Sequence, residues 1–360
     1  MVLDFQSIHR KFSNCAVLLS SGPRGGSTFA NEAIGIHPEI LWVPWNDKTL
    51  HRTWNKRNTD DTTFRNLLLR EPDYFNRESA IKILGSHNLG LFERYVDTVC
   101  SRRKLEEIYC LHGILYWIMS GMQMPLDQMK FWINKANTFR NMLPLQQALP
   151  LCRFVVMQRD PRPVTLSLAK VRADRKRFSD TDVVCGAIDW NRQAVGYAEF
   201  LGRSDNRSLL IRYEDLVCSN VDTLNDVYQF LGLDTLDHNE ISQRMKQVYF
   251  KRTGSVYDQE FGAENPRPSG IQREGLLRWK KQLDVVQITM IEKLTQKHAA
   301  FYGYNISAES AITLRACFKR IASLGLRLKQ LVRYWDAKVR LARLRHRIGP
   351  LFSDTIDNDV

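Results

Sequence analysis

A short apolar segment that stops at a glycine-rich turn constrains the fold of this chain more than any other feature. Residues 16–19 read Ala-Val-Leu-Leu, and Gly-Pro-Arg-Gly-Gly-Ser-Thr follows at 22–28. A short, uniformly apolar and β-prone run is typical of a strand buried on both faces of a parallel sheet. A helical pattern follows at 27–36 and ends at His37-Pro38, because the residue before proline avoids helical geometry. We therefore predict a strand, an anion-binding turn and a helix, in that order.

Further apolar runs bounded by turn residues predict three more strands, at 80–84, 153–157 and 208–213. Helical patterns are expected at 91–121, at 164–171 and around Phe230-Leu231, and the rest of 39–90 reads as irregular. Strands that alternate with helices predict a parallel sheet covered by helices and joined by right-handed crossovers. In such a sheet a ligand lies beyond the carboxyl ends of the strands.

The positive charge of the chain is concentrated near its C-terminal end. The formal net charge is +13, and residues 314–348 hold eleven Lys or Arg against the single acid Asp336. Apolar residues in this segment recur at steps of three and four, which predicts a basic amphipathic helix within a tail at 311–360. This helix is expected to dock on its own domain, to pair with a second copy, or to lie on an anionic membrane surface. The charge of the remainder is nearly balanced, and no nucleic acid partner is expected.

Cysteine usage and hydropathy bear on the cellular compartment. The seven cysteines are dispersed and never spaced as C-x-x-C, so neither a disulfide framework nor a zinc site is predicted. No window reaches the roughly 18 apolar residues of a membrane-spanning helix, and the first residues lack the apolar core of a secretion signal. We therefore expect a cytoplasmic protein, peripheral at a membrane if the tail binds one, and no metal.

The glycine-rich turn has the composition of a phosphate-binding loop. Its glycines let the backbone approach an anion closely, while amide groups and the helix dipole point at it. In the loop of nucleoside triphosphatases, G-x-x-x-x-G-K-[ST], a lysine stands where this chain has Ser27, whereas the hydroxyl position is kept by Thr28. The cation lies inside the loop, at Arg24. This displacement favours an anionic donor other than ATP or GTP. An ATP-dependent kinase of a small molecule and a non-catalytic anion-binding protein stay open as alternatives.

The same loop resembles a motif of sulfotransferases that use 3′-phosphoadenosine 5′-phosphosulfate (PAPS). Their 5′-phosphosulfate loop has the pattern P-[KR]-[ST]-G-[ST]-[ST], and the matching residues here are Pro23-Arg24-Gly25-Gly26-Ser27-Thr28-Phe29. In many of these enzymes a His-Pro pair follows at about the distance of His37-Pro38. The style of the motifs is nearest to the tyrosylprotein and carbohydrate sulfotransferases.

Further stretches match this family in the right order, over about residues 14–305. Asn134-Lys135-Ala136-Asn137 resembles the element N-K-x-P, with asparagine in place of the proline. Residues 154–162, with Ser167 eight residues after Arg159, resemble the element that binds the 3′-phosphate. The remaining matches are the Y-E-D-L segment Tyr213-Glu214-Asp215-Leu216, the helix ending at Phe230-Leu231-Gly232, the segment Arg267-Pro268-Ser269-Gly270, Trp279-Lys280 and Gly303-Tyr304.

The resemblance implies a P-loop-like parallel sheet flanked by helices, the sulfotransferase fold, with PAPS as the co-substrate. PAPS carries phosphate at both ends of one adenosine, so it needs two anion sites at neighbouring strand ends. The family implies that Ser27 and Thr28 hold the 5′-phosphate, that Arg24 and Lys135 steady the sulfuryl oxygens, and that Arg159 and Ser167 bind the 3′-phosphate. It further implies contacts of Tyr213 with adenosine and of Arg267 with the 3′-phosphate, whereas Glu214 and Asp215 are read as structural.

A general base for an alcohol acceptor is the least defined part of the expected site. In the tyrosylprotein and several carbohydrate enzymes, the general base is a glutamate six or seven residues after the His-Pro pair. In this chain Pro44 and Trp45 occupy those two positions. The nearest carboxylate is Asp47. His87 competes equally with it, because residues 82–87 resemble the K-T-H segment of cytosolic sulfotransferases, and His51 ranks third.

These expectations give a domain plan. Residues 1–310 form the sulfotransferase domain and 311–360 the basic helical tail. The cofactor elements are expected at 20–29, 134–137, 154–167, 209–217 and 265–280, and the acceptor pocket is expected within 41–130. The acceptor is expected to bear a hydroxyl or amine group and to be a carbohydrate, a lipid or a small molecule, with carbohydrate as the leading class.

Overall fold

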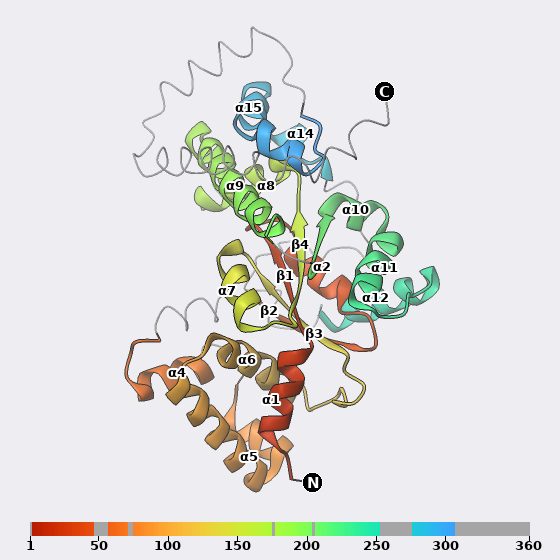
Figure 1. Cartoon of the computed structure of the whole chain (residues 1–360). Coiled ribbons are helices and arrows are strands. Elements are labelled where there is room, and N and C mark those ends of the chain that lie inside the picture. The colour runs from red at the N-terminus through yellow and green to blue at the C-terminus, as the bar shows by residue number, and fades with distance from the viewer. Residues whose placement is uncertain are drawn as a thin grey trace. The chain divides into compact units, whose positions relative to one another are not determined.

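The computed structural model describes residues 2–46, 57–70, 75–174, 177–203, 206–252 and 276–306. The chain divides into two compact units, each of which is described by itself. The first unit consists of residues 1–20, 27–155 and 224–269, and the second of 21–26, 156–223 and 270–360. Figure 1 labels the helices and strands along the chain. The expected basic tail and the segment around Arg267 lie outside the described residues, as do Asp47 and His51.

Five strands form one sheet in the order β2-β3-β1-β4-β5. Their bounds are Ala16–Ser21 (β1), Ile40–Asn46 (β2), Phe131–Ala136 (β3), Arg153–Gln158 (β4) and Ser208–Arg212 (β5). Strand β3 pairs in parallel with both β1 and β2, so that Ile133 lies opposite Val17 on one side and Trp42 on the other. All six residues of β1 are buried, as the apolar run at 16–19 predicts for the first four, and the last two are the polar residues Ser20 and Ser21. The predicted helix-covered parallel sheet is confirmed, and β1, β4 and β5 lie where strands were expected.

Strands β2 and β3 were not predicted, and one predicted strand is wrong. Residues 80–84 belong to helix α5, Arg77–Arg102, in which Ala80 and Leu84 are buried one helical turn apart. Gly85 does not end this segment but kinks the helix, with φ 73° and ψ 158°. A five-residue apolar run fits a strand and a buried helix turn equally well, so periodicity alone misassigns it.

The first unit surrounds its strands with helices. They are α1 Phe5–Asn14, α2 Ser27–Ile34, α4 Asp61–Arg70, α5, α6 Leu105–Met119, a 3₁₀ turn at Phe139–Asn141, α7 Met142–Ala148 and α12 His238–Arg252. Helix α11, Asn220–Leu231, begins in the second unit and ends in the first. Asp4 caps α1 by accepting a hydrogen bond from the Gln6 amide at 3.0 Å.

An aromatic core holds α1 and α6 against β3. Trp132 is fully buried, with its ring centroid 4.8 Å from that of Tyr109 and 5.7 Å from that of Phe12. The indole Nε1 donates to the Phe12 carbonyl at 2.7 Å, so its polar atom is satisfied inside the core. Gly113 permits this approach, because a Cβ there would lie 2.8 Å from the Phe12 ring.

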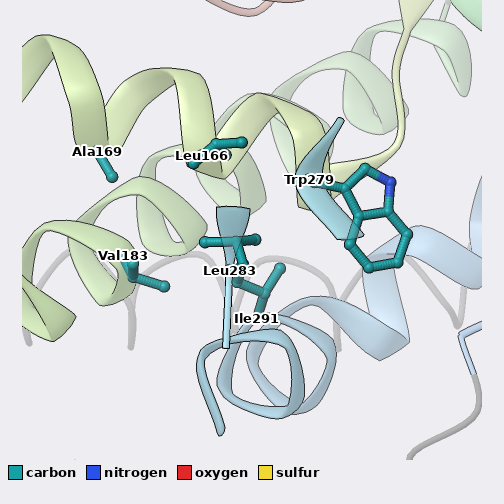
Figure 2. Close-up of a cluster of buried hydrophobic side chains, with 6 residues drawn as sticks. All are labelled: Leu166, Ala169, Val183, Trp279, Leu283 and Ile291. Atoms are coloured by element: carbon teal, nitrogen blue, oxygen red, sulfur yellow. The ribbon is translucent and has the colours of Figure 1, made fainter. Parts of the chain in front are cut away.

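The second unit packs four helices on one another. They are α8 Pro161–Arg172, α9 Asp180–Leu201, α14 Trp279–Gln282 and α15 Val285–Phe301, and the short helix α10 Tyr213–Cys218 directly follows β5. Figure 2 shows the side chains that form their shared core, namely Leu166, Ala169, Val183, Trp279, Leu283 and Ile291. Capping boxes start α9 at Ser179 and α15 at Asp284, which satisfies amide groups that a helix start leaves unbonded.

A charged cluster fixes the start of α8 against the C-terminal helices. Arg162 forms ion pairs with Asp160 at 2.6 Å and with Glu292 at 3.2 Å, and its guanidinium lies 4.4 Å from the Trp279 ring. All three charged side chains are at most 19% exposed, so the pairs are screened only weakly by water. The cluster therefore holds the residues after β4 in a defined position.

Candidate functional site

The loop after β1 has a backbone that only particular residues can adopt. Within the second unit, the Gly25 amide donates to the Gly22 carbonyl at 2.9 Å and closes a tight turn. Gly26 has φ 98°, and a Cβ there would lie 2.4 Å from the Tyr213 ring, so glycine is required both for the angle and for the close approach. Arg24 also has a positive φ, 67°, which costs a residue with a side chain roughly 1 kcal/mol. A strained, exposed arginine in a tight loop indicates a functional constraint.

Three of the predicted site residues meet in the second unit. Arg24 Nε donates to Ser167 Oγ at 2.7 Å, and Arg159 Nη1 donates to the Arg24 carbonyl at 3.4 Å. The Arg159 guanidinium lies 4.1 Å from the centre of the Tyr213 ring, a cation–π contact that holds its plane. The loop follows β1 and Arg159 follows β4, and these strands are neighbours in the sheet. Parallel strands whose crossovers run in opposite directions leave a ligand crevice at this point.

The main chain around Arg159 is fixed from both sides. Trp190 Nε1 donates to the Arg159 carbonyl at 3.0 Å, and the next amide, that of Asp160, donates to Glu214 Oε1 at 3.1 Å. The other carboxylate oxygen of Glu214 accepts from the Tyr304 hydroxyl at 2.7 Å. Burial raises the pKa of Glu214, and the hydrogen bond from Tyr304 opposes this shift. The Y-E-D-L and Gly-Tyr motifs are thus joined through Glu214, which has the structural role that the sequence predicts.

A narrow hollow with room for about one water molecule lies beside these residues. Its wall includes the loop at Gly22 and Pro23, the guanidinium-bearing Arg159, and Trp190. A buried amide oxygen from the same wall, Gln193 Oε1, has no hydrogen-bond partner among the described residues. A buried acceptor of this kind suits a donor group of a ligand, because leaving it unpaired is costly.

In the first unit, the end of β3 contacts the start of α2. Lys135 is 1% exposed, and its Nζ donates to Thr28 Oγ1 at 2.8 Å. Ser27 Oγ donates to Asn137 Oδ1 at 2.9 Å. A buried ammonium group beside the positive end of a helix makes a strongly electropositive site, which a bound anion stabilises. Phe29, from the same motif, is the third residue of α2 and is partly buried.

The His-Pro pair after α2 is structural. His37 is 3% exposed, its Nε2 bonds the Asp234 carbonyl at 3.1 Å, and its Nδ1 accepts from the Glu39 amide at 3.2 Å. Its ring centroid lies 4.7 Å from that of Tyr228. Burial lowers the pKa of His37, in agreement with a neutral ring that donates at one nitrogen and accepts at the other.

Of the candidate bases, only His87 lies within the described residues. It is exposed on α5, two residues after the kink at Gly85. The segment before it, residues 80–84, is helical and not the predicted strand, and the role of His87 as a base stays a prediction. Sequence reasoning also missed the contacts of Trp190, Tyr304 and Asn137; for Asn137 the available signal was its place where the family pattern has proline.

The comparisons with known proteins identify the class that this fold and loop define. A sequence model of the Sulfotransferase family matches residues 17–237, which is more than half of the chain. The chain therefore belongs to the sulfotransferase family, and the predicted class of enzyme, a sulfotransferase, is confirmed. No curated protein sequence matches the chain.

Solved structures agree with this assignment at the level of the fold. The sulfotransferase domain of the olefin synthase from Synechococcus PCC 7002 has a TM-score of 0.51 at 17% identity, covering 81% of this chain and 95% of that one. A sulfotransferase domain from the curacin biosynthetic pathway has a TM-score of 0.54 at 16% identity, covering 81% of this chain and 99% of that one. Within the described part of the chain, no helix is both long and apolar enough to cross a membrane.

Proposed function

We propose that the chain transfers a sulfuryl group from PAPS to a hydroxyl or amine acceptor, with carbohydrate as the leading acceptor class. The observation that carries this proposal is the meeting of Arg24, Arg159 and Ser167 after two neighbouring strands. A nucleotide with phosphate at both its 3′ and 5′ positions needs two cationic sites close together, whereas a triphosphate is one continuous anion. The residues present therefore fit a bisphosphorylated adenosine.

The 3′-phosphate is assigned to Arg159 and Ser167. The guanidinium plane of Arg159 lies over the Tyr213 ring, and the Arg159 carbonyl accepts a hydrogen bond from Trp190. The planar donors of Arg159 are therefore fixed before a ligand binds. Ser167 adds a hydroxyl from the second turn of α8, and Arg267 is proposed as a further cation. The Tyr213 ring is assigned to the adenosine.

The 5′-phosphosulfate is assigned to the loop amides beyond the turn that Gly25 closes and to the hydroxyls of Ser27 and Thr28. PAPS supplies the sulfuryl group: the acceptor oxygen or nitrogen bonds to sulfur, and the bond from sulfur to the 5′-phosphate oxygen breaks. The departing phosphate keeps the electron pair, and Lys135 and Arg24 stabilise the charge that spreads over the moving oxygens. The acceptor proton passes to a general base, for which Asp47 and His87 are proposed equally, ahead of His51.

A thermal-shift comparison tests the choice of nucleotide. We expect 3′-phosphoadenosine 5′-phosphate (PAP) to stabilise the protein more than ATP does at equal concentration. At 100 times its Kd, PAP should stabilise the protein by about 2.7 kcal/mol over the ligand-free protein. The R24A variant should lose most of this gain. R203A serves as the matched control, because Arg203 is an exposed arginine outside the loop. Greater stabilisation by ATP would favour a small-molecule kinase, and an R24A protein that kept full PAP binding would remove Arg24 from the site.

Activity identifies the acceptor and the base. Incubation with PAPS labelled in the sulfuryl group and a cell extract should transfer label to a molecule whose class can then be determined. With that acceptor in hand, D47N and H87N are compared at saturating PAPS. Loss of kcat in only one of them, with PAP affinity unchanged, would assign the base, and unchanged kcat in both would exclude these two residues.

A further inference from the structure

Two side chains at the end of β3 contact two consecutive hydroxyl groups at the start of α2. Lys135 bonds Thr28 at 2.8 Å, and Asn137 bonds Ser27 at 2.9 Å. Residues two apart in an extended segment face the same side, which explains how one strand end reaches both hydroxyls. The position of this strand end is fixed by β1, because Ser20 is paired with Ala136 and its hydroxyl donates to the Thr138 carbonyl at 3.1 Å.

The two contacts use their hydroxyl groups in opposite ways. A hydroxyl has a single hydrogen to donate and can accept at its oxygen. The Lys135 ammonium can only donate, so Thr28 accepts and keeps its own hydrogen for another partner. Ser27, in contrast, gives its hydrogen to the Asn137 carbonyl oxygen. In this arrangement Ser27 cannot donate that hydrogen to a phosphate.

The amide of Asn137 can resolve this conflict. An asparagine side chain presents an acceptor oxygen and a donor NH₂ at almost equivalent positions, and a half-turn about its last bond exchanges them. We propose that Asn137 is a positioning residue for the sulfuryl donor. When the 5′-phosphate binds, the amide turns, Nδ2 donates to Ser27 Oγ, and the Ser27 hydrogen is directed to the phosphate. This inference rests on the proposed function, because it requires a 5′-phosphate at Ser27.

The position of Asn137 supports this role over a purely structural one. The residue lies just beyond the last residue of β3 and is partly exposed, so its amide is not locked in a core. Aspartate at this position would be nearly the same in shape but could only accept. It would hold the Ser27 hydrogen permanently and bring a negative charge close to that of the phosphate. Alanine would remove the amide, and no side chain at this position would then orient the Ser27 hydroxyl.

Calorimetric titration of the full chain with two nucleotides tests the proposal. PAP carries both phosphates, and adenosine 3′-phosphate lacks the 5′-phosphate at which Asn137 acts. For PAP we expect N137A to raise Kd by about 5- to 10-fold and N137D by roughly 50- to 100-fold, the range of one hydrogen bond to a charged group plus a like-charge contact. For adenosine 3′-phosphate both variants should stay within about twofold of the wild type. N66D, an equal charge change at an exposed position of α4, is the control and should bind PAP as the wild type does.

A double-mutant cycle with Ser27 shows whether Asn137 acts through that hydroxyl. In an S27A background N137A should add less than about twofold to the Kd for PAP, because the hydroxyl that it orients is gone. Three results would each overturn the proposal: equal weakening of PAP and adenosine 3′-phosphate binding, additive effects on Kd in the cycle, or an N137D protein with the same Kd for PAP as N66D. Circular dichroism tests whether each variant is folded. If N137A is not folded, N137S replaces it in the same titrations. A wild-type protein that binds neither nucleotide would refute the proposed function itself.

Discussion

Removal of the Tyr304 hydroxyl tests how much its hydrogen bond stabilises the buried carboxylate of Glu214. Tyr304 is 5% exposed and donates to Glu214 at 2.7 Å, so Y304F removes a buried hydrogen bond to an ionised group. Such bonds contribute roughly 1.5–3 kcal/mol, and a loss of about 2 kcal/mol in the free energy of unfolding is expected near neutral pH. With a urea m-value of about 3 kcal/mol/M, the unfolding midpoint should fall by roughly 0.7 M.

The loss should depend on pH in a defined direction. The pKa of Glu214 is raised in the fold by burial, so its ionised form destabilises the fold, and this cost grows as the pH rises through the folded pKa. The Tyr304 bond lowers that pKa, and without it the pKa rises further. The difference between Y304F and the wild type should therefore be largest above both folded values. It should shrink as the pH falls below both folded values, where the carboxyl group is neutral in both proteins.

Urea unfolding followed by far-ultraviolet circular dichroism between pH 4.5 and 8 measures this effect. Y228F is the matched control, because the Tyr228 hydroxyl is buried and donates to the neutral carbonyls of Ala33 and Ile34, both at 3.3 Å. Its loss should be about 1 kcal/mol and independent of pH. A Y304F midpoint equal to that of the wild type, or a loss as flat with pH as that of Y228F, would refute the reasoning.

Two further substitutions probe the loop and the end of α2. G26A should weaken PAP binding by at least tenfold, because its Cβ would lie 2.4 Å from the Tyr213 ring at φ 98°, whereas G90A, with open space around it, should bind normally in the same titration. H37N should flatten the fall in thermal midpoint below pH 6.5. The pKa of His37 is depressed in the fold, so the stability that its neutral ring contributes is present above pH 6.5 and is lost as the pH falls through the folded pKa. A wild-type thermal midpoint that stayed constant from pH 7 to 5 would contradict this.

The sequence predicts those strands that contain an uninterrupted apolar run. The segments at 16–21 and 153–158 are bounded by turn residues and buried throughout or nearly so, so local composition suffices. Strand β3 was missed because its second half contains Asn134 and Lys135, polar residues that are buried for their contacts and not for their hydropathy. A buried lysine inside a strand departs from the usual pattern, and such departures are expected at functional sites.

The candidate site divides in the same way. The loop and the spacing between Arg159 and Ser167 are local patterns, so they can be recognised from the sequence alone. The contact of Arg24 with Ser167 depends on where α8 packs, which no local pattern encodes. The same holds for Tyr304, which lies 90 residues from its partner Glu214.

The proximity of Arg24 and Arg159 has a consequence for turnover. One guanidinium donates to the main-chain oxygen of the residue that bears the other, so two positive charges share a small region of the protein surface. If the proposed nucleotide binds between them, its charge relieves their mutual repulsion, which returns when the nucleotide leaves. Escape of the nucleotide is then electrostatically unfavourable. We expect product release to quicken with added salt and to limit the overall rate when salt is low.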